Sequence, residues 1–165
     1  MDLTALQWLE LLAVALAVVY LLLAIRQNIW CWAAAAVSTT LYLFIMYRAN
    51  LYMESVLQLF YLAMAAYGWY QWRRGGEDHG GLAVSTWPWR RHAVGIATVL
   101  GLVLVSGYLL ERFSDAALPF ADSFTTWGAV VATYMVTRKI LENWVYWFVI
   151  DSVSVYLYLS RELYF

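Results

Sequence analysis

The residues best suited to chemistry lie in one apolar stretch near the end of the chain, ENWVYWFVIDSVSVYLYLSR at 142–161. A helix turns by about 100° per residue, so it would gather the polar and aromatic side chains of this stretch along one stripe. Two tryptophan faces can stack on a flat heterocycle or hold a cation, and each contact contributes roughly 0.5–2 kcal/mol. The stripe and its margin consist of Asn143, Trp144, Trp147, Asp151, Ser154 and Tyr158.

Asp151 argues against a helix that only faces lipid. An ionisable group inside a spanning segment costs on the order of 2.5–3.5 kcal/mol, so Asp151 must face protein or a water-filled cavity. We interpret the stripe as the lining of a ligand pocket, in which Asn143 and Asp151 supply hydrogen bonds at the two ends. The alternative is that Trp144 and Trp147 pack or anchor the helix, while Asp151 pairs with a residue on another helix.

A second polar face is predicted in the apolar stretch at 51–72. Glu54, Gln58 and Tyr61 follow the spacing i, i+4 and i+7, which places them on one side of a helix. They either contribute to ligand binding or form a polar clasp between helices, worth about 0.6 kcal/mol in a membrane bundle. Both interpretations stay open from the sequence.

Composition places the chain in a membrane. It is 64% hydrophobic and 13% charged, with a mean hydropathy of +0.65. A soluble domain carries roughly 45–50% apolar and about 25% charged residues. We therefore expect an integral membrane protein in contact with a lipid bilayer. The net charge of −1 makes nucleic acid an unexpected partner.

Several kinds of catalytic and metal site are not expected. The single cysteine, Cys31, excludes an internal disulfide and a cysteine-based metal site. His79 and His92 lie in or beside the most polar segment, which argues against a haem or zinc site inside the bilayer. Motifs of the P-loop, GxSxG and HExxH types do not occur, and the only lysine, Lys139, sits at a helix end. We predict a protein that is not an enzyme, with no catalytic residue, metal or cofactor.

Six stretches are apolar enough to span a bilayer, for which a helix needs about 20 residues. They are 6–25, 29–47, 51–72, 93–110, 124–136 and 143–160. The first lacks a basic region and a cleavage site, so we interpret it as a span and not as a signal peptide. The fifth is short unless it extends into the loop before it or on to Ile140. Both prolines, Pro88 and Pro119, are expected in loops.

The charges of the connecting segments predict an orientation. Seven of the ten basic residues fall on one side of the membrane, namely Arg26, Arg73, Arg74, Arg90, Arg91, Arg138 and Lys139. Cytoplasmic loops carry the excess of Lys and Arg. We therefore expect the N-terminus outside and a hydrophilic linker at 73–92 inside. Trp30 and Trp32 are expected to be anchors at the inner interface.

A weak internal repeat suggests how the spans are arranged. Four residues recur at an offset of 114: Trp30, Ser38, Thr40 and Tyr42 match Trp144, Ser152, Ser154 and Tyr156. Two copies in the same sense need a linker helix between them, and 93–110 fits because it carries no charge. The expected organisation is a first three-helix bundle at 1–72, a cytoplasmic linker at 73–92, a linker helix at 93–110 and a second bundle of two helices at 111–165.

At several places the sequence resembles the PnuC family of bacterial vitamin transporters. The matching segments are NIWCW at 28–32, VSTTLY at 37–42, RANLYMES at 48–55, LQLFYLAMAAYGWYQW at 57–72 and ENWVYWFVID at 142–151. The most specific of them is the WxxWxxxD pattern of Trp144, Trp147 and Asp151, preceded by Asn143.

The resemblance implies an all-α membrane protein of the 3+1+3 type, related in architecture to the SWEET sugar transporters. It implies facilitated diffusion of nicotinamide riboside, which a cytoplasmic kinase traps by phosphorylation for NAD biosynthesis. The location would be the bacterial inner membrane, with several spans. The residues implied to contact the substrate are Asn143, Trp144, Trp147, Asp151, Gln58 and Tyr61.

Two departures from the family pattern affect these expectations. The family commonly has proline where this chain has Ala33, so a hinge at that point is in doubt. The chain ends at Phe165, where a seventh helix is expected to begin, so we expect that helix to be absent from this chain. The remaining alternatives are a transporter of a related vitamin such as thiamine and a non-transporting membrane subunit or sensor. Assembly into a homo-oligomer is left open.

Overall fold

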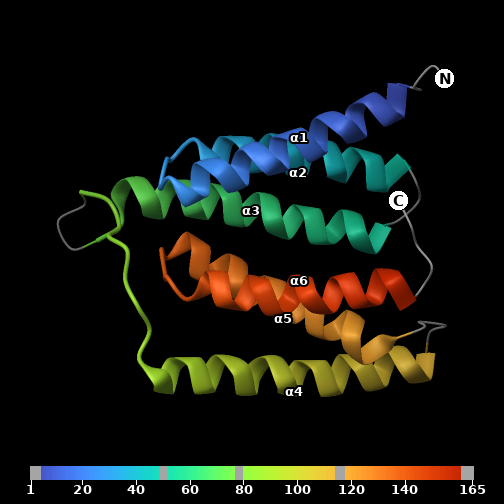
Figure 1. The fold of residues 1–165 in the computed structure, drawn as a ribbon. Helices are drawn as coiled ribbons and strands as arrows, with labels where there is room; N and C mark the ends of the chain where they lie inside the picture. Colours follow the sequence, from blue (N-terminus) through green and yellow to red (C-terminus); the bar gives the residue numbers. More distant parts are fainter. Residues whose placement is uncertain (1–4, 49–51, 77–79, 114–117, 161–165) are drawn as a thin grey trace. The chain divides into compact units, whose positions relative to one another are not determined.

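The computed structural model describes residues 5–48, 52–76, 80–113 and 118–160. Regular structure in these ranges is helical, apart from one isolated β-bridge (Figure 1). The helices are α1 (Ala5–Ile25), α2 (Cys31–Arg48), α3 (Tyr52–Arg74), α4 (Trp89–Phe113), α5 (Pro119–Thr137) and α6 (Asn143–Ser160). The chain divides into two compact units, Met1–Ala83 and Val84–Phe165.

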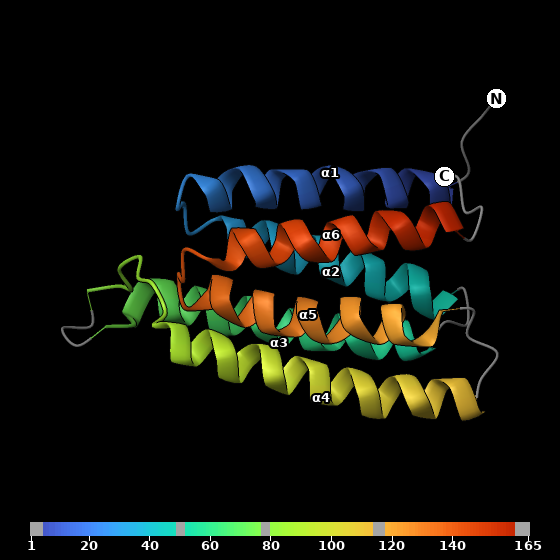
Figure 2. The ribbon, with the colours of Figure 1, turned by 60° about the horizontal axis from the view of Figure 1, so that its bottom comes forward.

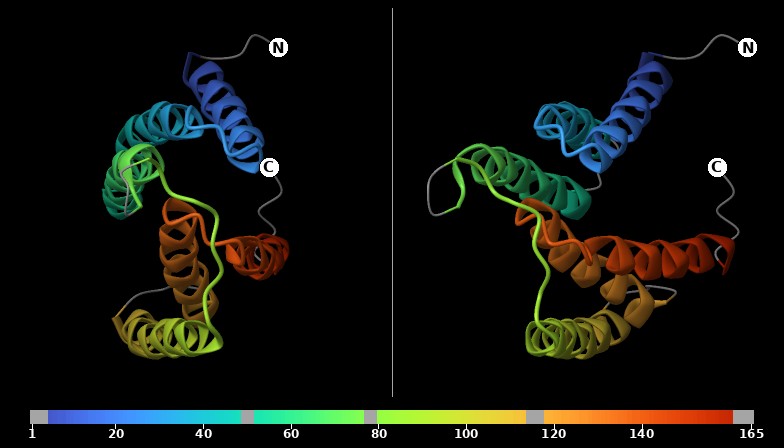
Figure 3. Two further views of the ribbon diagram at one scale, coloured as in Figure 1. Left: turned by 90° about the vertical axis from the view of Figure 1, so that its left-hand side faces the viewer. Right: turned by 60° about the vertical axis from the view of Figure 1, so that its left-hand side comes forward.

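In the first unit, α2 packs against both α1 and α3 (Figure 3). The contact with α1 includes a buried hydrogen bond of 2.8 Å from Ser38 Oγ to the carbonyl oxygen of Ala13. The contact with α3 is made by Trp32, whose ring covers Gly68 so closely that a Cβ there would lie 2.4 Å from it. The expectation that Trp32 is an interfacial anchor is therefore wrong, because its side chain is only 3% exposed and belongs to the core.

In the second unit, α5 is the helix that packs against both neighbours, α4 and α6. Glycines permit the close approach on each side. A Cβ on Gly107 of α4 would lie 2.4 Å from the Phe120 ring, and one on Gly128 of α5 would lie 3.0 Å from Ile150 of α6. The link between α5 and α6 lies at the end of the unit where α4 begins (Figures 1 and 2).

The helix boundaries follow the sequence prediction closely at α1 and α6 and less closely at α4 and α5. The predicted range 143–160 matches α6. α4 begins at Trp89, four residues before the predicted start, because the Pro88 carbonyl accepts the first backbone hydrogen bonds of the helix. α5 begins at Pro119, five residues before the predicted start, so the loop assignment of Pro119 is wrong. Proline favours the first helical position, since its missing N–H has no partner there in any case.

The link between α1 and α2 and the link between α5 and α6 have the same backbone geometry. Gln27 and Lys139 occupy the left-handed region with φ of 54° and 52°. In each link the next residue donates a 2.9 Å hydrogen bond five positions back, to the carbonyl of Leu23 or of Met135. This is the Schellman arrangement, which satisfies the last carbonyl groups of a helix.

This shared geometry corrects the offset of the internal repeat. Gln27 and Lys139 are 112 positions apart, and α2 and α6 correspond end to end at the same offset. The predicted offset of 114 matched residue types but placed Trp30, which precedes α2, against Trp144, which lies inside α6. At the offset of 112, Trp32 in α2 corresponds to Trp144 in α6.

Two helices in the described ranges are long and apolar enough to cross a membrane by length and composition, α1 over Gln7–Ile25 and α4 over Trp89–Phe113. On α4, apolar side chains such as Val94 and Leu104 are about two-thirds exposed. The other described helices are shorter or carry more polar residues, as α6 does with Asn143 and Asp151.

Candidate functional site

Asn143 opens α6 and holds its amide in one orientation. Its backbone N–H and its side-chain Nδ2 both donate to the carbonyl oxygen of Ile140, at 3.2 and 2.6 Å. The residue is only 5% exposed, and its Oδ1 has no hydrogen-bond partner among the described residues. A buried acceptor without a partner is costly, by about 1–3 kcal/mol, so Oδ1 is an unused hydrogen-bond acceptor at the start of α6.

The other three predicted residues of α6 lie beside the face that packs on α5. Ile150 marks that packed face, because it is 4% exposed and lies against Gly128. Asp151 follows it by about 100° and is exposed, and Trp144 and Trp147 are half-buried on the same side. Of the predicted stripe and its margin, Trp144, Trp147 and Asp151 therefore lie on the less buried side of α6, while Asn143 is buried on the packed side.

The remaining polar residues of the α6 stripe have local roles or fall outside the described residues. The hydroxyl of Ser154 donates to the carbonyl of Ile150 on its own helix at 3.0 Å, and Ser152 does the same to Phe148 at 2.7 Å. The side chain of Tyr158 lies outside the described residues.

The second predicted group lies on α3. Gln58 and Tyr61 are half-buried there, and the Tyr61 ring packs edge-on against Phe60 at 5.6 Å between ring centroids. Glu54 belongs to the same predicted face, but its side chain lies outside the described residues. Gln58 and Tyr61 belong to the first unit, whereas the four α6 residues belong to the second.

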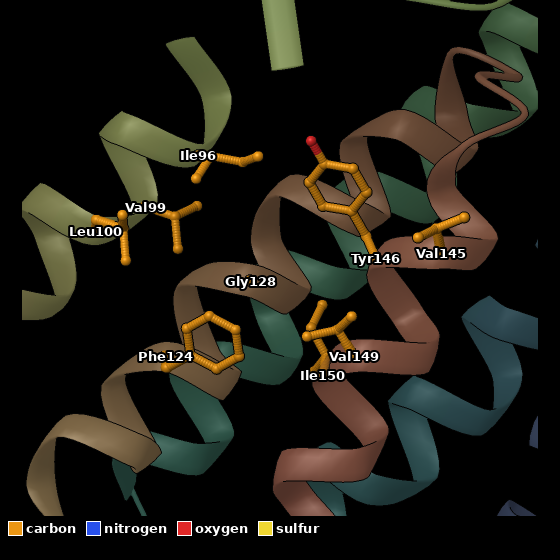
Figure 4. Close-up of a pocket in the computed structure, with 9 residues that line it drawn as sticks. All are labelled: Ile96, Val99, Leu100, Phe124, Gly128, Val145, Tyr146, Val149 and Ile150. Carbon is orange, nitrogen blue, oxygen red and sulfur yellow. The ribbon is translucent and has the colours of Figure 1, made fainter. Parts of the chain in front are cut away.

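A cavity of about 290 Å³ lies between α4, α5 and α6 (Figure 4). It is on the side of α6 that faces away from Trp144, Trp147 and Asp151. Its lining is apolar except for the hydroxyl of Tyr146. None of the predicted substrate-binding residues lines it, so the cavity and the predicted site are separate features. The lining residues are Ile96, Val99, Leu100, Phe124, Gly128, Val145, Tyr146, Val149 and Ile150.

Sequence reasoning missed a polar cluster at the end of the second unit where α4 and α6 begin. His92 Nδ1 lies 2.9 Å from the Tyr146 hydroxyl, and His92 Nε2 lies 3.8 Å from Glu142 Oε1. The Trp87 ring packs at 5.6 Å from the His92 ring. Glu142 and Tyr146 have the helical i, i+4 spacing, but their partner is about fifty residues earlier, so no local pattern could identify it.

A helical protein with apolar exposed helices and a polar, aromatic face on α6 belongs to the class of helical membrane proteins. Its relatives narrow that class to transporters. A model of the family described as nicotinamide mononucleotide transporter matches residues 7–165. The chain therefore belongs to this family, the PnuC family of vitamin transporters.

Two curated relatives carry different substrate names. The chain is 31% identical over 152 residues to the riboflavin/roseoflavin transporter RibM of Streptomyces davaonensis, covering 90% of this chain and 70% of that protein. It is 27% identical over 188 residues to the nicotinamide riboside transporter PnuC of Escherichia coli, covering 96% and 77%.

A solved structure supports the fold. The crystal structure of the vitamin B3 transporter PnuC matches with a TM-score of 0.71 at 22% identity, over 92% of this chain and 67% of that one. At this level of identity the match shows a shared fold, and the substrate has to be argued from the residues.

Proposed function

We propose that this protein is a uniporter for nicotinamide riboside, which it moves across the bacterial inner membrane by facilitated diffusion and alternating access. Phosphorylation in the cytoplasm then traps the nucleoside for NAD biosynthesis. The observation that carries the proposal is the buried, unpartnered Oδ1 of Asn143 at the start of α6. The carboxamide of nicotinamide offers the N–H donor that this acceptor lacks.

The neighbouring residues suit the rest of the ligand. The nicotinamide ring of the riboside is a cation, and Trp144 and Trp147 offer half-buried indole faces on the side of α6 that also carries Asp151. A cation over an indole face is stabilised by about 0.5–2 kcal/mol, depending on its desolvation. A carboxylate nearby adds an electrostatic preference for a positively charged ring.

The proposal includes an architecture and an orientation. We propose the 3+1+3 arrangement, with 1–72 as the first bundle, 93–110 within the linker helix and the N-terminus outside. Gln58 and Tyr61 on α3 are proposed as further substrate contacts, on the strength of the family resemblance and their half-buried positions.

Riboflavin is the second candidate substrate. The 31% identity to RibM favours it, and a flavin also combines a flat ring with an N–H donor. The two candidates differ in charge, because the flavin ring is neutral at neutral pH. The carboxylate of Asp151 therefore favours the cationic riboside over the neutral flavin. Thiamine is also cationic and aromatic, so Asp151 should favour it in the same way as the riboside.

The test is ligand binding to the purified full chain in lipid nanodiscs, with nicotinamide riboside, thiamine and riboflavin as probes. Asp151→Asn is expected to weaken riboside binding about tenfold, which corresponds to about 1.4 kcal/mol, and Trp147→Ala by a similar factor. Ser152→Ala on the same helix is the matched control, because its hydroxyl bonds only to its own helix in the described structure. Unchanged riboside affinity in both site variants would reject the site, and riboflavin binding without riboside binding would favour the second candidate.

A further inference from the structure

The stretch that leads into α4 is joined to the link between α5 and α6 by backbone pairing. Ser85 N–H donates to the Lys139 carbonyl at 3.0 Å, and Leu141 N–H donates to the Ser85 carbonyl at 2.9 Å. Together these bonds form the one parallel β-bridge of the described residues, between Ser85 and Ile140. Ser85 therefore holds the backbone on both sides of Ile140.

Contacts between the side chain of Glu142 and the residues Trp87 and His92 reinforce this backbone pairing. Glu142 accepts a 3.4 Å hydrogen bond from the Trp87 N–H with one oxygen and faces His92 Nε2 at 3.8 Å with the other. His92 is also hydrogen-bonded to Tyr146 at 2.9 Å, and its ring packs against the Trp87 ring at an interplanar angle of 56°. The His92 and Glu142 side chains are only 21% and 29% exposed. A hydrogen bond in such part-buried surroundings is electrostatically stronger than one in water.

The residue that this pairing holds is the one that orients Asn143. The Ile140 carbonyl accepts both the backbone N–H and the Nδ2 of Asn143. Because Nδ2 is hydrogen-bonded to Ile140, the amide is held in one orientation about its terminal bond, and Oδ1 remains as the buried acceptor. A shift of the link at Ile140 would therefore turn the Asn143 amide.

We propose that Ser85, Trp87 and His92, together called the clip, position the Asn143 amide for the substrate. Glu142 connects the clip to the link between α5 and α6 through its contacts with Trp87 and His92. His92 and Glu142 are then positioning residues, which act on the substrate through Asn143 without touching it. This inference rests on the proposed role of Asn143 in binding a ligand N–H donor. Since the hydrogen-bonded path runs within the second unit, it requires no contact with the first.

The first arm of the test asks whether the clip holds the link, and it needs no ligand. Hydrogen exchange of the full chain in nanodiscs is compared among the wild type, His92→Phe, His92→Gln and Thr98→Val. Exchange of the Ser85 and Leu141 amides is expected to accelerate by at least about fivefold in His92→Phe, because their bonds open more often. His92→Gln retains polar atoms near Glu142 and Tyr146 and should exchange nearly as slowly as the wild type. Thr98→Val removes only a bond within α4 and is the matched control.

The second arm asks whether the clip acts through Asn143. His92→Phe is expected to weaken nicotinamide riboside binding by about 3–10-fold in the wild-type background and by less than about twofold in the Asn143→Ala background. His92→Gln should restore most of the affinity. Equal losses in both backgrounds, or unchanged exchange at Ser85 and Leu141, would overturn the inference.

Failure of the proposed function gives a different result. In that case the wild type binds no nicotinamide riboside, and the double-mutant comparison is made with whichever of thiamine or riboflavin does bind. If the wild type binds none of the three, the role of the clip in positioning Asn143 for these substrates is rejected, while the exchange data still decide whether the clip holds the link.

Discussion

Asn143 Nδ2 donates a 2.6 Å hydrogen bond to the carbonyl oxygen of Ile140, which ties the first residue of α6 to the link before it. The bond fixes the amide nitrogen on Ile140 and leaves the amide oxygen, Oδ1, buried without a partner in the described structure. Asn143 therefore has a structural role at the start of the helix through Nδ2, and in the proposed function a separate role in ligand binding through Oδ1.

Replacing Asn143 tests the two roles together. Asn143→Ala removes the bond to Ile140 and should lower the free energy of unfolding by about 1 kcal/mol. It should also weaken nicotinamide riboside binding about tenfold, since the carboxamide loses its acceptor, which corresponds to about 1.4 kcal/mol. Chemical unfolding in detergent and binding in nanodiscs measure the two effects. A stability loss with no change in affinity would show that the side chain serves the helix alone.

Gly68 is expected to tolerate no side chain. A Cβ at this position would lie 2.4 Å from the ring of Trp32, which is buried and packs against the rings of Tyr20 and Trp72, so a shift of this ring would disturb the core. Gly68→Ala should therefore destabilise the protein by about 1–3 kcal/mol, as overpacking of a core does. The measurement is the unfolding midpoint in detergent.

The matched control for this change is Gly101 on α4, which is also helical. A Cβ there meets nothing within 4 Å, so Gly101→Ala should be neutral or stabilise by up to about 1 kcal/mol. Equal effects of the two substitutions would contradict the close packing of Trp32 on Gly68.

The two left-handed residues, Gln27 and Lys139, predict a pattern of substitutions. A non-glycine residue in this conformation costs about 1–2 kcal/mol, and glycine avoids that cost at the expense of about 0.5–1 kcal/mol of chain entropy. Glycine should therefore be neutral or slightly stabilising at both positions, while valine should destabilise, because β-branched residues fit positive φ poorly. Thermal unfolding of the four variants checks this. If valine and glycine behaved alike at either position, the shared geometry of the two links would be in error.

The elements that were predicted well from the sequence are those with a strong local signal. The range of α6 agreed with the prediction because it begins directly after the charged link and continues as one apolar run. Membership of the PnuC family was also predicted, from the WxxWxxxD pattern and the segments around it, and the family match confirms it. The start of α5 was missed because Pro119 was taken as a loop residue, although a proline suits the first turn of a helix. Pro88 does lie in the loop, but α4 begins directly after it and not at the predicted position four residues later.

The remaining features depend on contacts between distant residues. Trp32 has the sequence surroundings of an interfacial tryptophan, and only the small Gly68 on another helix makes room for it in the core. The His92 and Glu142 contact joins residues fifty positions apart, which no local period can show. The assignment of Gln58 and Tyr61 to the substrate site stays a prediction.

We propose that the chain carries nicotinamide riboside across a membrane by facilitated diffusion. The most direct measurement is counterflow in liposomes that contain the purified full chain and an excess of unlabelled riboside inside. A uniporter should accumulate external labelled riboside transiently, without an ion gradient, and Asp151→Asn should slow this accumulation more than Ser152→Ala. The absence of any transient accumulation in liposomes whose protein is folded and binds riboside would contradict transport and leave a binding subunit or sensor as the function.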